Sequence, residues 1–377
     1  MTVKTGPLAQ GGIQMEQGIS IFLKERGNTL AGRDVKLISA DTGGRPAGAK
    51  TKAQELVELD RVDVLMGPLA AFELLAIADY VQKAQIPIIV DAAAEDVTQR
   101  HPNPYLIRPT TSSAQCPHVL AHFAATELKL KRMVTISEDF AFGYEQCAGF
   151  QRVFEDNGSK IVRKLWPPLV TLDYTPFIAR IGDADGVFMG FAGSNPVRFM
   201  RAYAGLGLKH IPLLGGWTAM DDALLNSLGD EALGVYSASN YSAELDTPSN
   251  KKFVADMLKD YNAIPGGYSS GMYFGGMCIE AALEKLGGNS DNRRALADAM
   301  RATSLKNTPR GDFHFDKLGN VVSDVFIRRC ERKNGKLVNA IIKTYPQVSQ
   351  FWTYDKHWFL SQPVYSRNYP PATNLEP

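Results

Sequence analysis

The sequence lacks the patterns that mark several large classes of protein. Its cysteines are only four and lie far apart without a Cys-x-x-Cys pair, which argues against a zinc finger or disulfide framework and favours buried thiols. Its apolar runs are short and interrupted by charge or glycine, so no membrane-spanning helix is expected. Lysine plus arginine (41) nearly equals aspartate plus glutamate (40), so the basic excess of a nucleic-acid-binding protein is absent.

Catalytic signatures are equally scarce. No serine or cysteine stands in a Gly-x-Ser-x-Gly turn after a strand, and no nucleophile is grouped with a base. His118 and His122 lie one helical turn apart, but no carboxylate or cysteine has the spacing of a further ligand, so we interpret them as part of a solvated helix face. The sequence therefore predicts a protein that is not an enzyme and that uses no cofactor and no metal.

Short β-rich apolar segments alternate with longer amphipathic segments along most of the 377 residues. Strands are expected at residues 35–38, 62–66, 86–90, 133–137, 187–190, 211–214 and 235–239, and helices at residues 46–59, 72–84, 116–128, 142–156, 196–206 and 223–228. This alternation indicates βαβ units and parallel sheets. Helices at residues 250–261, 269–285 and 293–301 follow, and then strands at residues 311–315, 325–330 and 337–342 with a hairpin turn at Asn334-Gly335.

The predicted fold class is α/β, with two doubly wound parallel-sheet lobes joined by three crossover segments. Lobe 1 comprises residues 1–109 and 242–322, lobe 2 comprises residues 110–241 and 323–343, and residues 344–377 form an aromatic C-terminal strap packed on the surface. Hinges are expected near residues 108–110, 239–242 and 320–324. A cleft between the lobes is the expected binding site.

Candidate site residues follow from the strand ends. In open parallel sheets a ligand binds beyond the carboxyl ends of the strands, and here those loops combine small residues with aromatic ones. The candidate ligand-binding residues are Leu8, Gln10, Ala70, Ala71, Phe72, Asp91, Ala92, Ala93, Ala94, Phe140, Phe142, Phe191, Ser194, Trp217 and Tyr273. The alternatives left open are helix capping for Asp91, Asp139, Ser194 and Asn195, burial in a lobe core for Trp217 and Tyr273, and a crossing-strand ion pair for Arg108.

Motifs in a fixed order carry a resemblance to a known family. They are Gly6-Pro7-Leu8-Ala9, Asp41 with Ala49, residues 62–68 (VDVLMGP), Asn103-Pro104-Tyr105 with Arg108, residues 139–143 (DFAFG), Asp173-Tyr174-Thr175, Gly229-Asp230 with Gly234-Val235, Tyr273, residues 282–284 (ALE), and Arg310-Gly311 with Phe315-Asp316. The set, spread over nearly the whole chain, resembles the type I periplasmic binding proteins, in their leucine/isoleucine/valine-binding branch.

The resemblance implies a location, a mechanism and partners. Members of this family are the periplasmic solute receptors of ABC importers, so the expected partners are a small-molecule ligand and the membrane permease subunits, with no nucleic acid and a monomeric state. Hinge closure on the ligand is the implied mechanism. Since the family places a full strand before Gly6, an upstream segment with an export signal is expected before Met1. A cytoplasmic ligand sensor of the same fold, similar to the amide-sensing regulators, is an alternative.

Departures from the family pattern bear on the ligand. Hydroxyl side chains that hold an amino acid's carboxylate in the family align with Ala71 and with Ala93 or Ala94, and the acid that holds its ammonium aligns with Trp217. An aromatic residue that covers the ligand aligns with Gly11, which we expect to open space for a ring. A desolvated ammonium needs a carboxylate or a π-face, so these exchanges favour an aromatic carboxylate, such as a benzoate or phenylpropanoid derivative. A branched-chain or other amino acid is the alternative ligand.

Overall fold

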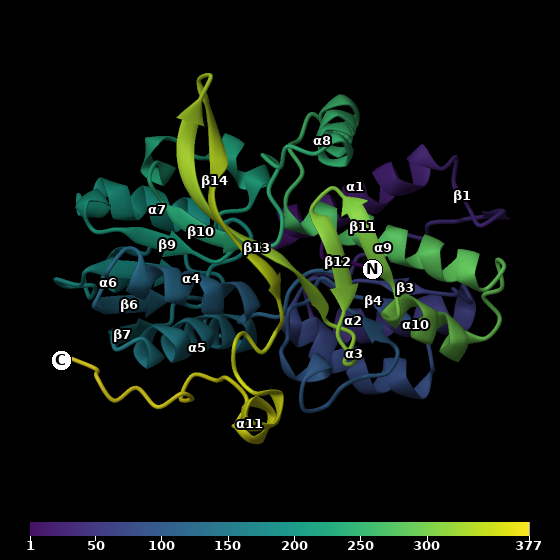
Figure 1. The fold of residues 1–377 in the computed structure, drawn as a ribbon, viewed down its shortest axis with the longest axis horizontal. Coiled ribbons are helices and arrows are strands. Elements are labelled where there is room, and N and C mark those ends of the chain that lie inside the picture. The colour runs from purple at the N-terminus through teal and green to yellow at the C-terminus, as the bar shows by residue number, and fades with distance from the viewer. Residues whose placement is uncertain (377) are drawn as a thin grey trace. The chain divides into compact units, whose positions relative to one another are not determined.

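A computed structural model describes residues 1–376 of the chain. These residues form two compact units (Figure 1). Unit 1 contains Met1–Ser112 and Leu245–Asp324, and unit 2 contains Ser113–Glu244 and the residues from Val325 onward. Both units combine helices with strands, which confirms the predicted α/β class.

Unit 1 is built on a short parallel sheet of β3 (Leu65–Met66), β4 (Ile88–Ile89) and β5 (Leu106–Ile107), in that order. Its helices are α1 (Ala9–Glu25), α2 (Pro46–Gln54) with a π-helical turn at Glu55–Leu59, α3 (Ala71–Lys83), a 3-10 turn at Asp96–Thr98, α8 (Pro248–Tyr261), α9 (Gly267–Lys285) and α10 (Arg293–Arg301). The remaining strands are the hairpin of β1 (Thr29–Leu30) and β2 (Arg33–Asp34), and the antiparallel pair of β11 (Ser304–Thr308) and β12 (Gly311–Phe315).

Helices α1 and α9 pack closely in unit 1. The rings of Phe22 and Tyr273 meet edge to face with centroids 5.4 Å apart. A Cβ placed on Gly18 would lie 1.9 Å from the carbonyl oxygen of Ser269, so only glycine permits this approach of the two backbones. Apolar residues of α1 at helical spacing, such as Met15, Ile19 and Phe22, are buried against this neighbour.

Unit 2 carries a longer parallel sheet. Its strands are β6 (Arg132–Ile136), β7 (Lys160–Leu165), β8 (Gly186–Met189), β9 (Leu213–Gly215) and β10 (Tyr236–Ser239), in the spatial order β7-β6-β8-β9-β10. β13 (Val321–Lys333) enters unit 2 and pairs antiparallel with β10, and β14 (Lys336–Val348) pairs with β13. The helices are α4 (Gln115–Thr126), α5 (Ala141–Asp156), α6 (Thr175–Ile178) and α7 (Asn195–Gly205), with 3-10 turns at Leu208–His210, Asp222–Ser227 and Asp230–Ala232.

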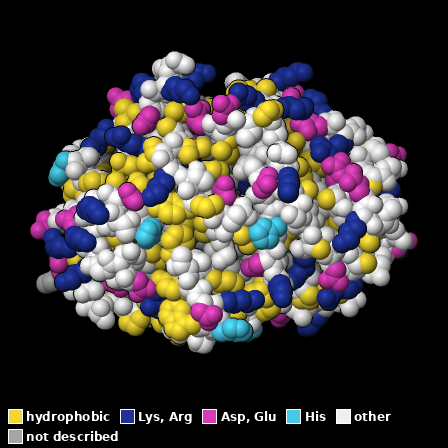
Figure 2. Space-filling model, viewed as in Figure 1, with side chains coloured by type: hydrophobic (Ala, Val, Ile, Leu, Met, Phe, Trp, Pro, Cys, Tyr) yellow, Lys and Arg dark blue, Asp and Glu magenta, His cyan; other side chains and the backbone are white. Residues whose placement is uncertain are grey.

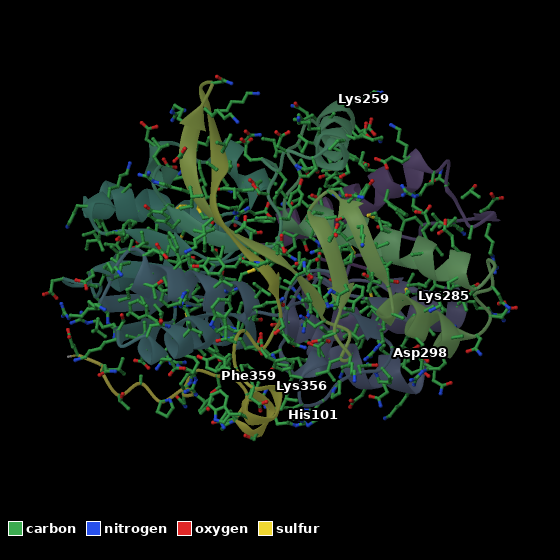
Figure 3. The ribbon with its side chains drawn as sticks, in the orientation of Figure 1. His101, Lys259, Lys285, Asp298, Lys356 and Phe359 are labelled. Atoms are coloured by element: carbon green, nitrogen blue, oxygen red, sulfur yellow. The ribbon has the colours of Figure 1, made fainter. Side chains whose placement is uncertain are left out.

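The segment after β14 lies along unit 2 as a strap that contains α11 (Lys356–Ser361) (Figures 1 and 3). Phe359 is 4% exposed, and its ring lies 5.7 Å from that of Tyr365, whose hydroxyl is 3.0 Å from His118 Nε2. The prediction that His118 faces solvent is therefore wrong, because the strap covers this face of α4. Near its end, the Glu376 N–H donates to the Val162 carbonyl of β7 (2.9 Å).

Several element predictions need correction. No strand forms at residues 35–38, because among the described residues nothing pairs with them there. The helix expected at residues 223–228 is the 3-10 turn Asp222–Ser227. The elements that were not predicted are α1, α6, α11, β1, β2, β5, β7 and β11. The four cysteines are free and buried. In the described part of the chain, every helix is too short or too polar to cross a membrane. Acidic and basic side chains are intermingled on the face shown in Figure 2, as the near-zero net charge implies.

Candidate ligand-binding site

The loops after β3 and β4 lie side by side in unit 1. The Ala92 N–H donates to the Pro68 carbonyl (3.1 Å), which joins residues 91–94 to the loop that leads into α3. Ala70 has an extended backbone and precedes α3, and its N–H donates to the Glu73 carboxylate (3.3 Å). Ala71 is therefore the first residue of α3, where backbone N–H groups and the helix dipole favour an anion.

Arg108 holds the loop after β4 in place. Its buried guanidinium donates to the carbonyls of Ala94 (2.6 Å) and Ala92 (3.3 Å), and also to the Thr98 hydroxyl. A further hydrogen bond reaches Asn320 Oδ1 (2.8 Å). These hydrogen bonds are made to carbonyl, hydroxyl and amide oxygens, because the loop turns its backbone oxygens toward this side chain. The ion pair expected for Arg108 stays a prediction.

Other candidates of unit 1 differ in their surroundings. Leu8 is buried at the start of α1, Gln10 is exposed, and Phe72 is half-buried. Asp91 is buried, and a Cβ on Gly271 of α9 would lie 2.4 Å from its Oδ1. Asp91 does not cap a helix, since residues 91–94 are not helical and the next helical turn begins at Asp96.

Two sequence interpretations about rings in unit 1 change. The Tyr273 hydroxyl donates to Glu25 Oε2 (2.8 Å) at the far end of α1, and its ring lies 4.6 Å from that of Phe253, so Tyr273 is not brought to the strand-end loops. Gly11 does not open space for a ligand ring. A Cβ on Gly11 would meet Leu69 at 2.6 Å and the ring of Tyr268 at 3.0 Å, so these side chains fill that space.

Three strand-end loops also meet in unit 2. The loop after β6 contains Glu138, which accepts hydrogen bonds from the Ala192 N–H (3.0 Å) and the Asn195 side chain (2.9 Å) of the loop after β8. The Thr218 hydroxyl of the loop after β9 donates to the Phe191 carbonyl (2.7 Å). These bonds fix the relative positions of the candidates Phe140, Phe142, Ser194 and Trp217 within the unit.

Glu138 is a buried carboxyl, and in the described part of the chain it has no hydrogen bond to an arginine or a lysine. Burial raises its pKa to about 7, although the hydrogen bonds from Ala192 and Asn195 favour the ionised form. The side chain of Asn195 is thereby occupied, and neither it nor Ser194 makes a side-chain cap of α7, so the capping prediction is wrong. Asp139 likewise caps no helix and accepts from Tyr144 (2.6 Å) and Arg367 (2.9 Å).

The aromatic candidates of unit 2 fall into two groups. Phe191 is fully buried in the core, with its ring 5.3 Å from Tyr174 and 5.1 Å from Phe199. Phe140 and Phe142 stack on each other at the start of α5 with centroids 6.0 Å apart. Trp217 lies two residues after the end of β9 and is 3% exposed. Phe142, Phe191 and Trp217 are thus buried near the strand ends of unit 2, and Phe140 is partly exposed.

A buried amide beside Trp217 was not predicted. Gln146 of α5 is fully buried, and neither atom of its side-chain amide has a hydrogen-bond partner among the described residues. A Cβ on Gly216, the residue before Trp217, would lie 2.2 Å from Gln146 Oε1. Buried polar groups are seldom left unpaired, so the Gln146 amide is an exception among the described residues. Sequence reasoning had no signal for it beyond a glutamine on the inner face of a helix.

The described residues contain no group of histidine, cysteine, aspartate and glutamate side chains that could hold a metal ion. The strand-end loops offer N–H donors at a helix start in unit 1, and rings with a buried amide nearby in unit 2.

Comparison with known proteins agrees with this architecture. The model of the family described as "Periplasmic binding protein" matches residues 1–336, so the chain belongs to the periplasmic binding proteins. Membership implies a periplasmic location, small-molecule ligands and ABC-importer permease subunits as partners.

Individual relatives extend the comparison. The Leu/Ile/Val-binding protein homolog 6 of Brucella suis is 29% identical over 353 residues, covering 90% of this chain and 89% of its own length. A solute-binding protein of an ABC transporter from Rhodopseudomonas palustris BisB5, solved with 3,4-dihydroxybenzoic acid, is 33% identical, with a TM-score of 0.88 and coverage of 93% of this chain and 96% of that chain. A solute-binding protein of an ABC transporter from Rhodopseudomonas palustris HaA2, solved with p-hydroxybenzoic acid, is 28% identical. Its TM-score is 0.86, and the match covers 93% of this chain and 96% of that chain.

Proposed function

We propose that the protein binds an aromatic carboxylate, such as a hydroxylated benzoate, as the solute of an ABC importer. The observation that carries this proposal is Trp217, which lies two residues after the end of β9 in a strand-end loop of unit 2. An indole offers a flat apolar face to an aromatic ring, and a carboxylate at this position would instead suit an ammonium group. The hydroxybenzoates bound to the two Rhodopseudomonas palustris relatives support the same ligand class.

Polar groups at the strand ends suit the rest of such a ligand. In unit 1, the N–H of Ala71 lies at the first turn of α3, where a helix N-terminus attracts a carboxylate. In unit 2, the buried Gln146 amide has both a donor and an acceptor to offer a ring hydroxyl. The prediction that the lobes close on the ligand by a hinge stays a prediction.

Thermal shift measurements with a panel of ligands test this proposal. Binding to the folded state alone raises the melting temperature, so benzoate, 4-hydroxybenzoate and 3,4-dihydroxybenzoate should each raise it, whereas leucine, isoleucine and valine should not. Trp217→Ala should weaken aromatic binding by about 1–3 kcal/mol, roughly 5- to 150-fold in Kd, because the stacking surface is lost.

Trp358→Ala is the matched control, since Trp358 is 41% exposed on α11 of the strap. Unchanged affinity in Trp217→Ala would place this indole in the core of unit 2 instead. A shift by branched-chain amino acids alone would contradict the proposed ligand class.

Amino-acid binding is the second candidate function. It is favoured by the name of the Brucella suis relative, which matches 90% of this chain. The loop after β6 in unit 2 offers two carboxyls for an ammonium group, Glu138 and Asp139. Both already accept hydrogen bonds, Glu138 from Ala192 and Asn195, and Asp139 from Tyr144 and Arg367. The same ligand panel separates the two candidates.

A further inference from the structure

Two polar residues of unit 2 stand on the core-facing sides of β13 and β14. Arg328 lies on β13 opposite Ser237 of β10, and Asn339 lies on β14, which pairs with β13 (Figure 1). Alternate residues of a strand share one face, so Arg328 faces the same way as Cys330, and Asn339 faces the same way as Leu337. Cys330 and Leu337 belong to the hydrophobic core of unit 2, so the two polar side chains occupy positions that suit apolar ones.

Both side chains are buried and bonded to the loop after β9. Arg328 is 1% exposed, and Asn339 is fully buried. Arg328 Nη2 donates to the Met220 carbonyl (2.9 Å), and Asn339 Nδ2 donates to the same carbonyl (2.8 Å). Met220 comes three residues after Trp217, so side chains from two other strands hold the loop that carries this indole.

Asp222, which begins the 3-10 turn after this loop, completes the cluster. Its buried carboxylate accepts from Arg328 Nη1 (2.8 Å) and from Asn339 Nδ2 (3.2 Å). Arg328 also donates to the Tyr241 carbonyl (3.1 Å) and to the Ser237 hydroxyl (3.2 Å). The cluster of Asp222, Arg328 and Asn339, which we call the polar clamp, therefore ties the loop after β9 to β13, β14 and the end of β10.

Stability alone does not account for the polar clamp. Taking a carboxylate and a guanidinium out of water is costly, and apolar residues of similar volume often replace such clusters with little loss of stability. A network of hydrogen-bonded polar groups is instead directional and favours a single arrangement of its members. The Met220 carbonyl, which accepts from two side chains of the clamp, is thereby fixed in direction as well as in position.

The other hydrogen bonds of the loop hold its beginning or its internal shape. The Gly216 N–H donates to the Met189 carbonyl (3.1 Å), and the Thr218 hydroxyl donates to the Phe191 carbonyl (2.7 Å), which ties this part of the loop to β8 and the residues after it. The Met220 N–H donates back to Gly216 within the loop (3.2 Å). The end of the loop is tied to other strands through the polar clamp.

We propose that the polar clamp is a positioning device for Trp217, holding the loop after β9 so that the indole keeps the place from which it stacks on an aromatic ligand. Asp222, Arg328 and Asn339 act through the loop and are positioning residues. The link to the ligand rests on the proposed function, whereas the hold on Trp217 is measurable in the absence of any ligand.

A chain with one tryptophan allows the indole to be followed directly. The sequence contains four tryptophans, so Trp166→Phe, Trp352→Phe and Trp358→Phe together leave the fluorescence of Trp217 alone. Acrylamide should quench this fluorescence slowly, because Trp217 is 3% exposed.

An apolar clamp tests the proposal in this chain. Asp222→Leu, Arg328→Met and Asn339→Leu together should raise the quenching constant at least about threefold, because the Met220 carbonyl loses both side-chain donors and turns toward water. An unchanged quenching constant would overturn the proposal.

Ligand binding gives a second readout. In calorimetric titration, the apolar clamp should bind 3,4-dihydroxybenzoate at least about tenfold more weakly than the parent chain, while its melting temperature falls by less than about 5 °C. A merely structural cluster would lower the melting temperature and leave the Kd unchanged, and that result would overturn the proposal. If the parent chain does not bind 3,4-dihydroxybenzoate, the proposed function fails, and the quenching constant alone decides whether the clamp positions Trp217.

Two single variants complete the test. Gln151→Leu removes a buried amide of α5 that donates to the Pro371 carbonyl (3.2 Å), so it should lower the melting temperature without changing the quenching constant or the Kd. Asn339→Leu keeps the ion pair of Arg328 and Asp222, and it replaces the apolar clamp if that variant does not fold. Its quenching constant should rise at least about 1.5-fold, because one of the two donors to Met220 is lost, and no rise would overturn the proposal.

Discussion

The strand-end loops of the two units differ in what they offer a ligand. In unit 1 the loops are made of alanines, so what they present is backbone, held by the guanidinium of Arg108. In unit 2 the loops and the helix beside them present side chains, namely the rings of Phe140, Phe142 and Trp217 and the amide of Gln146. The loops of unit 1 thus differ from those of unit 2 in offering backbone groups rather than rings and a side-chain amide.

The anchors of the two sets of loops differ as well. Arg108 is a buried cation that donates to carbonyl, hydroxyl and amide oxygens, while Glu138 is a buried carboxyl that accepts from an N–H group and an amide. The pKa of an arginine lies far above physiological pH, whereas the pKa of Glu138 is raised to about 7. The hydrogen bonds of Arg108 should therefore be insensitive to pH near neutrality, and those of Glu138 should respond to it.

The largest expected effect comes from breaking the anchor of unit 1. Arg108→Met should lower the free energy of unfolding by about 3–5 kcal/mol, because the carbonyls of Ala92 and Ala94 lose a buried charged donor. Urea unfolding followed by circular dichroism measures it. Arg294→Met is the control, since its ion pair with Asp298 is exposed and should be worth less than about 1 kcal/mol. A loss below about 1 kcal/mol for Arg108→Met would mean that the loop does not depend on this side chain.

The anchor of unit 2 should give stability a pH dependence. A carboxyl whose pKa is raised on folding binds a proton more tightly in the folded state, so the free energy of unfolding should fall as pH rises from about 4.5 to about 7. Glu138 should contribute on the order of 1–3 kcal/mol to this fall. Burial also raises the pKa of Asp222, to about 6. Ionisation of Asp222 should therefore lower the free energy of unfolding as well, at a lower pH than that of Glu138.

Glu138→Gln tests this assignment through urea unfolding at a series of pH values. The variant should lose the part of the slope between about pH 6 and 7, because the amide does not titrate. Glu127→Gln, a substitution at an exposed carboxylate of unit 2, should keep that part of the slope. A Glu138→Gln profile identical to that of the parent chain would show that another group titrates there.

The smallest expected effect comes from removing one backbone N–H donor at the start of α3 in unit 1. Ala71→Pro removes one N–H at the first position of α3, where proline is well tolerated and the preceding residue is already extended. The Kd for 3,4-dihydroxybenzoate should rise about tenfold in calorimetric titration, with the melting temperature within about 2 °C of the parent chain. Lys356→Pro, at the first position of α11, should leave the affinity unchanged. An unchanged Kd in Ala71→Pro would place the carboxylate elsewhere.

Much of the fold could be predicted from the sequence, because helices and parallel strands each have a characteristic local pattern of apolar residues. The range 293–301 matches α10 residue for residue, and the ranges for α4, α5 and α7 are within two residues of the observed ends. The strand predicted at residues 35–38 is not observed, because a strand forms only where it pairs with a neighbouring strand. β7 was missed because its lysines and arginine interrupt the apolar alternation.

The candidate site was predictable in outline and not in detail. The rule that ligands bind beyond strand ends located the loops around Ala71 and Trp217. The roles of Arg108, Glu138 and Gln146 depend on hydrogen bonds made, or left unmade, across long sequence separations, which no local pattern reveals. The same limit applies to Gly11, whose neighbourhood is filled by Tyr268, a residue 257 positions away in the chain (268 minus 11).

The last residues of the strap have a consequence for how this protein behaves among its own copies. β7 is the outermost strand of its sheet, and an open strand edge is a template on which another chain can pair. Glu376 occupies part of that edge through Val162, and its carboxylate is paired with Arg132 (2.6 Å). The strap therefore covers part of an edge on which another copy of the chain could pair. Chains shortened before the strap should aggregate more readily on heating than the full chain.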